Sequence, residues 1–254
     1  RDPNFLTCTP LKNGFDNNKV IFEPVGKAGD NYVANVKRLV IEGENKKKLI
    51  VKIAPTFEAI RQAMNFNVLF QNEHVMYTEV LPKFEQLEKE AGVPEEERFK
   101  FAKCYGSTCE QPYEVLILED LNELNYTMLD RFGNLSNECV KSVLKNFAKL
   151  HSLSFVLRHK EVETYEHLKT KLLDLWTIMA DSQDFKFMFE GLENDMLTLI
   201  DDPEKNQILK HKAIEMINLS MKLSKADCNS KYTILQQGDA WTNNILFKFE
   251  VNIT

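Results

Sequence analysis

The 254 residues are enough to bury a core and to form one or two domains. A hydrophobic fraction of 43% and a charged fraction of 28% are ordinary for a globular protein, and the net charge of -6 argues against a nucleic-acid binder. No apolar run approaches the ~20 residues that a membrane-spanning helix needs, so we expect no membrane segment.

The cysteines are scattered, odd in number at five, and include no second closely spaced pair. This pattern favours reduced thiols over a disulfide framework or a zinc site, and we therefore expect a cytoplasmic protein. The first residue is Arg1, not Met, and no leader peptide follows it. We expect that the start of the chain is missing.

The N-terminal part predicts a small antiparallel sheet, because three segments rich in β-branched residues alternate with turns. These segments are residues 20–25, 32–41 and 48–54. The first turn contains Gly26, Gly29 and Asn31. A loop of this kind can bring backbone N–H groups close to phosphate oxygens, although a plain hairpin turn is the simpler interpretation.

Lys52 lies near the end of the third expected strand, between apolar neighbours, and a helical pattern follows over residues 57–91. Glu73 completes the apolar stripe of this helix, where a carboxylate is costly unless it is paired. Lys52 is the expected partner. The alternatives left open are a snorkelling surface lysine and a solvated glutamate at the edge of the stripe.

In the middle of the chain, residues 99–105 and 114–118 predict two more strands, and the second runs directly into Glu119-Asp120-Leu121. A long helix is expected from Glu138 to His159, followed by two or three further helices from Lys160 to about residue 224. His151 lies close to the apolar face of the long helix. It is predicted to be a hydrogen-bonded core histidine, with the backbone of residues 237–239 as its partner.

Near the end of the chain, apolar runs at residues 232–235 and 245–249 predict two strands on either side of a tight loop. Gly238 permits the turn, and the five-residue spacing lets Asp239 and Asn244 present a carboxylate and an amide to one point. A carboxylate can take the proton of a hydroxyl nucleophile, and an amide oxygen can ligate Mg²⁺. Taken alone, the same pattern is also typical of a surface turn.

Together these segments resemble the ecdysteroid kinase-like family, in the choline-kinase and aminoglycoside-phosphotransferase branch of the protein-kinase-like fold. The matching segments are Gly29-Asp30-Asn31-Tyr32, Ile50-Val51-Lys52, Glu73 with Tyr77 and Leu81-Pro82, residues 116–121, Leu150-His151 and Gly238-Asp239-Ala240-Trp241-Thr242-Asn243-Asn244-Ile245. The resemblance covers essentially the whole chain. It implies a two-lobed α+β fold, with an N-lobe of antiparallel sheet plus helix over residues 1–120 and a mostly helical C-lobe over residues 121–254.

The resemblance also implies an ATP- and Mg²⁺-dependent phosphotransferase whose acceptor is a small-molecule alcohol, such as an ecdysteroid or another steroid. It implies that Asp239 is the general base for the acceptor hydroxyl and that Asn244 binds Mg²⁺. Lys52 would hold the nucleotide phosphates and Glu73 would orient Lys52. The nucleotide-binding residues implied in this way are Gly26, Gly29, Asn31, Lys52, Glu73, Glu119 and Leu121.

Two departures from the family pattern bear on activity. Gln237 stands where the family usually has a histidine that organises the loop. No aspartate follows Asn244 before Thr254, whereas the family has a second metal-binding aspartate in an Asp-Phe-Gln segment there. We therefore expect an incomplete C-lobe. The alternative function is a truncated, non-catalytic kinase-like protein that binds nucleotide or a lipophilic ligand.

Overall fold

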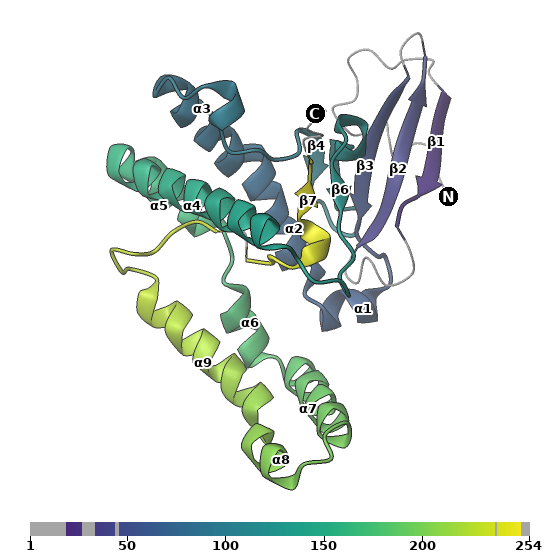
Figure 1. The fold of residues 1–254 in the computed structure, drawn as a ribbon, viewed down its shortest axis with the longest axis vertical. Helices are drawn as coiled ribbons and strands as arrows, with labels where there is room; N and C mark the ends of the chain where they lie inside the picture. Colours follow the sequence, from purple (N-terminus) through teal and green to yellow (C-terminus); the bar gives the residue numbers. More distant parts are fainter. Residues whose placement is uncertain (1–18, 27–33, 44–45, 237, 250–254) are drawn as a thin grey trace.

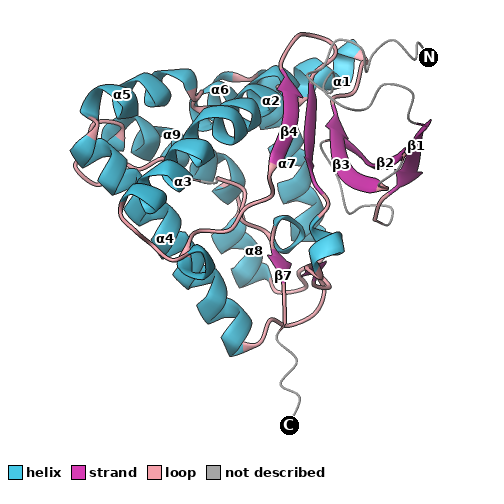
Figure 2. Cartoon of the chain, turned by 90° about the horizontal axis from the view of Figure 1, so that it is seen from above, coloured by secondary structure: helices cyan, strands magenta, loops and turns pink. Residues whose placement is uncertain are grey.

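The computed structural model describes residues 19–26, 34–43, 46–236 and 238–249. Within these residues, five antiparallel strands form a sheet at one side of the molecule, and helices occupy the other side (Figures 1 and 2). The strand order is β1-β2-β3-β5-β4. The strands are β1 Lys19–Pro24, β2 Asn35–Glu42, β3 Lys47–Ile53, β4 Cys104–Thr108 and β5 Val115–Glu119.

The alternation of side chains along the strands gives the sheet two different faces. One face carries an apolar cluster made by Leu39, Ile41, Leu49, Val51, Val115 and Ile117. The opposite face carries Lys52. Since directly opposed residues of antiparallel strands point the same way, the register puts one group of residues on this Lys52 face: Val36, Arg38, Ile50, Lys52, Leu116 and Leu118.

The segment expected to be one helix is divided. It comprises α1 Glu58–Ala63, α2 Phe66–Val75, a π-helical turn over Met76–Val80, and α3 Leu81–Glu90. The expectation of a continuous helix over residues 57–91 was therefore wrong at Met64 and Asn65. Asn65 adopts a left-handed conformation with φ 50°, which asparagine tolerates better than most residues and which ends the first helix.

Helix α4, Asn137–Lys160, packs with α3 and with α5, Val162–Lys171, around the largest buried cluster. Ser136 begins α4, because its hydroxyl oxygen accepts a hydrogen bond from the N–H of Cys139 at 3.2 Å. The cluster combines Val80 and Phe84 with Leu153 and Leu157, so it draws residues from both sides of position 120. The division into lobes at that position stays a prediction.

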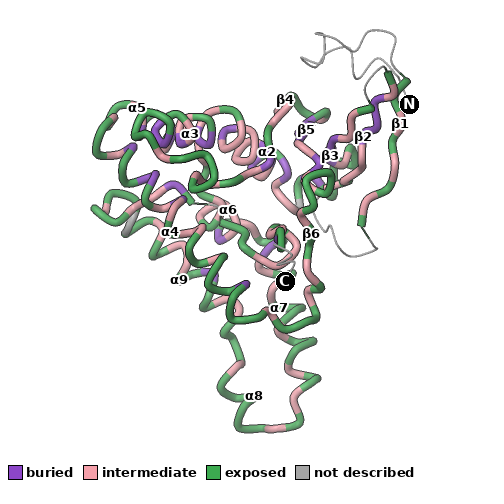
Figure 3. Tube along the Cα trace, turned by 45° about the horizontal axis from the view of Figure 1, so that its top comes forward, coloured by how far each residue is buried: buried purple, intermediate pink, exposed green. Residues whose placement is uncertain are grey.

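Four further helices project away from the sheet and form an arm, residues 175–227 (Figure 1). They are α6 Leu175–Asp181, α7 Gln183–Thr198, α8 Pro203–Leu209 and α9 Lys212–Asp227. Together with α5 they make five helices where two or three were expected, so that prediction was wrong in number. The arm has a small core around Phe185 and Ile217, and its tip at α8 is largely exposed (Figure 3). Among all the described helices, none combines the length and apolarity that crossing a membrane requires.

Three strand predictions were wrong in place or extent. The strand expected at residues 99–105 begins only at Cys104, since the N–H of Phe99 donates to Glu88 and the rings of Phe99 and Phe101 pack onto the helical core instead. Residues 232–235 are irregular. The run at 245–249 contributes only β7, Leu246–Phe247, which pairs with the unpredicted β6, Thr127–Met128.

Candidate functional site

The Lys52 ammonium group forms an ion pair with the carboxylate of Glu73, 21 residues downstream. Lys52 comes from β3 and Glu73 from the face of α2 that is turned toward the sheet. The side chains are 27% and 34% exposed, so the pair is accessible from solvent. The next residue, His74, places Nδ1 2.9 Å from the hydroxyl of Ser107 on β4. These two contacts hold α2 against the sheet beside Lys52.

Tyr77 lies in the π-helical turn one helical turn beyond Glu73 and packs between two buried clusters. Burial raises the pKa of its phenol well above the ordinary value, and the nearby Glu73 carboxylate raises it further. Tyr77 is therefore neutral over the physiological range. Single π turns inside helices occur often at functional sites, and this one follows directly on the helix that carries Glu73.

A connector of residues 119–125 leads from β5 out of the sheet. Glu119 ends β5, and its N–H donates to the carbonyl of Lys103 at 2.8 Å. Leu121 begins a short 3₁₀ helix, Leu121–Leu124, and its carbonyl accepts from the N–H of Tyr126 at 3.1 Å. The connector is therefore an ordered turn, and Glu119 and Leu121 lie on either side of Asp120.

Asp120 is fully buried and accepts a hydrogen bond from Nε of Arg38 at 2.5 Å. Its other oxygen accepts from the N–H of Asn122 at 3.1 Å and from the side-chain amide of Asn122 at 2.9 Å. Burial alone would raise the pKa of this carboxyl. The hydrogen bonds from Arg38 and Asn122 outweigh burial and hold the pKa below its ordinary value, so Asp120 is charged.

The loop before β7 brings Asp239 and Asn244 together. Gly238 has φ +80°, a left-handed conformation that glycine adopts without strain. A 3₁₀ turn, Thr242–Asn244, then carries Asn244 back, so that its side-chain Nδ2 donates to the Asp239 carboxylate at 2.8 Å and to the Asp239 carbonyl at 2.9 Å. Both side chains are exposed.

The chain entering this loop is tied to the helical core. The N–H of Leu235 donates to the hydroxyl of Ser154 on α4 at 2.7 Å, and both residues are buried. Residues 232–235 therefore find a hydrogen-bond partner in a helix side chain and not in a neighbouring strand. His151, one turn earlier on α4, stacks on Phe147 with ring centroids 6.0 Å apart. His151 is only partly buried, and among the described residues no hydrogen bond joins it to residues 238–239, while residue 237 lies outside the described residues.

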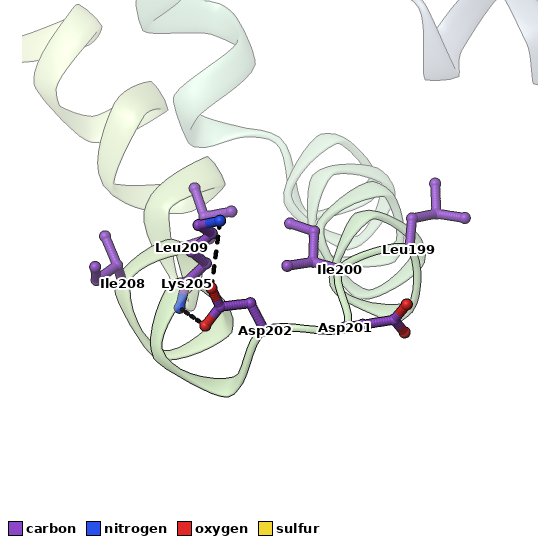
Figure 4. A pocket seen from close by; sticks show the side chains of 7 residues that line it. All are labelled: Leu199, Ile200, Asp201, Asp202, Lys205, Ile208 and Leu209. Atoms are coloured by element: carbon purple, nitrogen blue, oxygen red, sulfur yellow. Dashed lines mark hydrogen bonds and ion pairs between the residues drawn. The ribbon is translucent and has the colours of Figure 1, made fainter.

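A hollow of about 500 Å³ lies between the loop and the N-terminal half of α4. Its lining is mainly apolar and includes Leu144, Trp241 and Ile245. Another hollow, at the tip of the arm, is formed by Leu199, Ile200, Asp201, Asp202, Lys205, Ile208 and Leu209 (Figure 4). In this hollow Asp202 caps the N-terminus of α8, and its carboxylate lies 3.3 Å from the Lys205 ammonium. The polar groups of the hollow therefore stabilise the start of the helix. None of the predicted site residues belongs to the arm.

The predicted residues thus fall into three groups. Lys52 and Glu73 meet, Asp239 and Asn244 meet, and Glu119 and Leu121 flank the connector turn. Gly26 is described, with φ 78°, whereas Gly29, Asn31 and Gln237 lie outside the described residues.

The sequence predictions missed Arg38, Asp120 and Ser154 as partners in this region. Arg38 offered one signal, because an arginine alternates there with apolar residues in a β-strand pattern, as Lys52 does in the next strand.

The sequence also matches a known protein family. The model of the ecdysteroid kinase-like family matches residues 28–253, nearly the whole chain. No curated protein and no solved structure gives a significant match. The antiparallel sheet at the N-terminal end and the helical remainder agree with the kinase-like fold of that family. The chain therefore belongs to the ecdysteroid kinase-like family, whose members are kinase-like phosphotransferases of small molecules.

Proposed function

We propose that this protein is an ATP-dependent phosphotransferase that transfers the γ-phosphoryl group of ATP to an alcohol of a small molecule. The observation that carries the proposal is the partly exposed ion pair between Lys52 and Glu73. Phosphoryl transfer asks for little covalent chemistry from the protein. Its main needs are a cation fixed against the phosphates and a base beside the acceptor hydroxyl.

The Lys52 face suits a nucleotide because it is charged at one place and apolar beside it. Lys52 would pair with the phosphates while Glu73 keeps its ammonium group in place. Ile50 and Leu118 lie next to Lys52 on the same face and oppose each other across β3 and β5. Their apolar side chains would form a floor for the purine base, and the backbone groups of Glu119 and Leu121 would bind its edge. Gly26, Gly29 and Asn31 would cover the phosphates.

Asp239 is assigned as the general base. Its carboxylate is exposed and its orientation is supported by Asn244, so an acceptor hydroxyl can reach it from solvent. The acceptor proposed first is an ecdysteroid or a similar steroid-like alcohol, because the chain belongs to the ecdysteroid kinase-like family. We propose that the protein acts in the cytoplasm.

Mg²⁺ would be held by the side-chain oxygen of Asn244 together with phosphate oxygens. Hard oxygen ligands suit this ion, and Asn244 uses its nitrogen for Asp239, which leaves the amide oxygen for a cation. Among the described residues, no three His, Cys, Asp or Glu side chains gather into a metal site. Asn244 is therefore the one protein ligand assigned. The ion would supply neutralisation of the phosphate charge.

The test uses the purified chain with Mg·ATP and a panel of alcohols that includes an ecdysteroid. We expect a rise in melting temperature with Mg·ATP and transfer of labelled γ-phosphate to an alcohol. Asp239→Ala should abolish transfer and preserve nucleotide binding, and the matched control Asp195→Ala, at an exposed position of the arm, should change neither. Binding without transfer to any alcohol would favour the non-catalytic, nucleotide-binding alternative. Absence of Mg·ATP binding would refute the kinase proposal.

A further inference from the structure

The ion pair between Arg38 and Asp120 differs from most other ion pairs among the described residues because its carboxylate is fully buried. The Asp120 side chain is 0% exposed and that of Arg38 is 24% exposed. The two residues are 82 positions apart, one in the middle of β2 and the other at the turn that leaves β5. Removing two charges from water is costly, so a pair of this kind needs nearly complete hydrogen bonding. Asn122 provides it through two hydrogen bonds to Asp120.

The register of the sheet shows what this pair connects. Arg38 opposes Ile50, and Ile50 opposes Leu118 on the other side of β3. Lys52 is two residues beyond Ile50 on the same strand face, which is about 7 Å along the strand. Arg38 therefore shares with Lys52 the face proposed to bind the nucleotide. It reaches across that face to the connector that leaves β5 after Leu118.

A second ion pair makes a similar connection at the surface. The Lys48 ammonium on β3 lies 2.8 Å from the carboxylate of Glu123 in the connector, with side chains 31% and 49% exposed. Exposed pairs of this kind contribute little, because water screens them and both side chains lose freedom. Both ion pairs join the sheet to the connector. Of the two, only the Arg38–Asp120 pair has a carboxylate shielded from water and held by further hydrogen bonds.

We propose that Arg38 and Asp120 are positioning residues for the nucleotide. Their buried ion pair holds the connector against the Lys52 face, so that the backbone groups at Glu119 and Leu121 lie at a fixed distance from the apolar floor. Neither residue touches the reacting atoms. This inference rests on the proposed function, since it assigns the pair a role in binding the nucleotide of that reaction.

The test compares two double variants in the full chain. Arg38→Met with Asp120→Leu replaces the buried pair by apolar side chains of similar size, which avoids leaving one charge buried alone. Lys48→Met with Glu123→Leu is the matched control at the exposed pair. We expect the first variant to raise the Kd for Mg·ATP about tenfold or more, measured by calorimetry, and the control to change it less than about twofold. A tenfold change corresponds to about 1.4 kcal/mol.

A second readout separates positioning from a general effect on folding. The melting temperature of the Arg38→Met, Asp120→Leu variant should remain close to that of the unmodified chain, and its turnover at saturating ATP should change much less than its Kd. An unchanged Kd in this variant, while the unmodified chain binds Mg·ATP, would overturn the positioning role alone. An equal rise in Kd in the control variant would also overturn it. If the unmodified chain binds no Mg·ATP, the proposed function and this inference fail together.

Discussion

The side-chain amide of Asn244 donates hydrogen bonds to the carboxylate and to the main-chain carbonyl of Asp239, at 2.8 and 2.9 Å. The two residues that the proposal names as metal ligand and base are therefore parts of one small structure. An exposed carboxylate would otherwise sample several orientations. Here the loop itself limits them, with Gly238 providing the turn and Asn244 closing it.

Asn244→Ala removes both hydrogen bonds and the one protein ligand assigned to Mg²⁺, and it should lower phosphoryl transfer roughly 10²-fold because the base and the metal ion are no longer held in place. Both side chains are exposed, so the melting temperature should hardly change. Steady-state kinetics and a thermal scan on the same preparation measure the two effects. Asn194→Ala, on an exposed face of α7, is the control, and equal rates for Asn244→Ala and the control would contradict the prediction.

Glu73→Gln should weaken nucleotide binding without destabilising the fold. The glutamine keeps the shape of the side chain but no longer attracts the Lys52 ammonium, so the Kd for Mg·ATP should rise several-fold. The free energy of unfolding should change by less than about 1 kcal/mol, because the pair is partly exposed. The control is Glu79→Gln, which removes the Lys171–Glu79 pair with side chains 34% and 33% exposed. The expectation fails if both variants bind Mg·ATP equally well.

Breaking the Arg61–Glu114 ion pair should lower the stability of the protein strongly. It joins α1 to the sheet, is almost completely buried, and has two parallel hydrogen bonds, one of them 2.9 Å from Nη1 of Arg61 to Glu114. The hydrogen bonding to Glu114 also raises the pKa of the guanidinium. Arg61→Met leaves a buried carboxylate unpaired and should cost about 3–5 kcal/mol of unfolding free energy in urea titrations.

The matched variant for this pair is Arg61→Met combined with Glu114→Leu. It should recover most of the lost free energy, because both charges are then gone. Lys89→Ala, which breaks the exposed Lys89–Glu85 pair, should stay within about 0.5 kcal/mol of the unmodified chain. If the double variant is as unstable as Arg61→Met, the loss would come from packing and not from the uncompensated charge.

Ser154→Ala tests how the loop is tied to α4. It leaves the buried N–H of Leu235 without a partner, which should cost about 1–3 kcal/mol. Ser152→Ala is matched in type and helix, but Ser152 is exposed and bonds only within α4, at 2.8 Å to the carbonyl of Lys149. Urea titrations should therefore show almost no change for Ser152→Ala. Hydrogen exchange of the Leu235 amide should accelerate in Ser154→Ala, and an unchanged exchange rate would rule the contact out as an anchor.

Acid should destabilise the protein through Asp120. The pKa of its carboxyl is lower in the folded state than the ordinary value of 3.8. This carboxyl therefore adds stability that is fully present above that value and is lost as the pH falls below it toward the folded-state pKa. Urea midpoints between pH 6 and about pH 2.5 measure the slope. In Asp120→Asn the slope below about pH 4 should be shallower, and an identical slope would show that Asp120 keeps its ordinary pKa.

Periodicity predicted the parts of this fold that depend on neighbours in the chain. Apolar and β-branched runs bounded by turns indicated β1, β2, β3 and β5 within a few residues, and the helical stripe indicated α2, α3 and α4. The strand predictions failed at residues that contact a distant part of the chain and not a neighbouring strand. Phe99 and Phe101 are typical strand residues, but their rings pack against the buried helices. A strand was also expected at Leu235, but its N–H donates to the hydroxyl of Ser154 on α4.

The candidate site likewise has features that the sequence predicted and features that only the fold brings together. The chemical types and their order were readable from the sequence: a lysine in a strand, a glutamate on the apolar stripe of the next helix, and an aspartate and an asparagine in one tight loop. The Asp239–Asn244 contact spans five residues, and so the local turn alone can make it. The Lys52–Glu73 pair could be inferred because a buried stripe does not tolerate an unpaired carboxylate.

The partners of Asp120 and Leu235 were decided only by the tertiary structure. Arg38 reaches Asp120 across 82 residues, and Ser154 reaches Leu235 across 81. Neither strand nor helix periodicity extends over such separations, and an arginine or a serine in a sequence does not indicate which distant backbone or carboxylate it will meet. The sequence determined which residues could carry the chemistry. The packing of β2 beside β3 and β5, and of the loop on α4, decided which residues hold them in place.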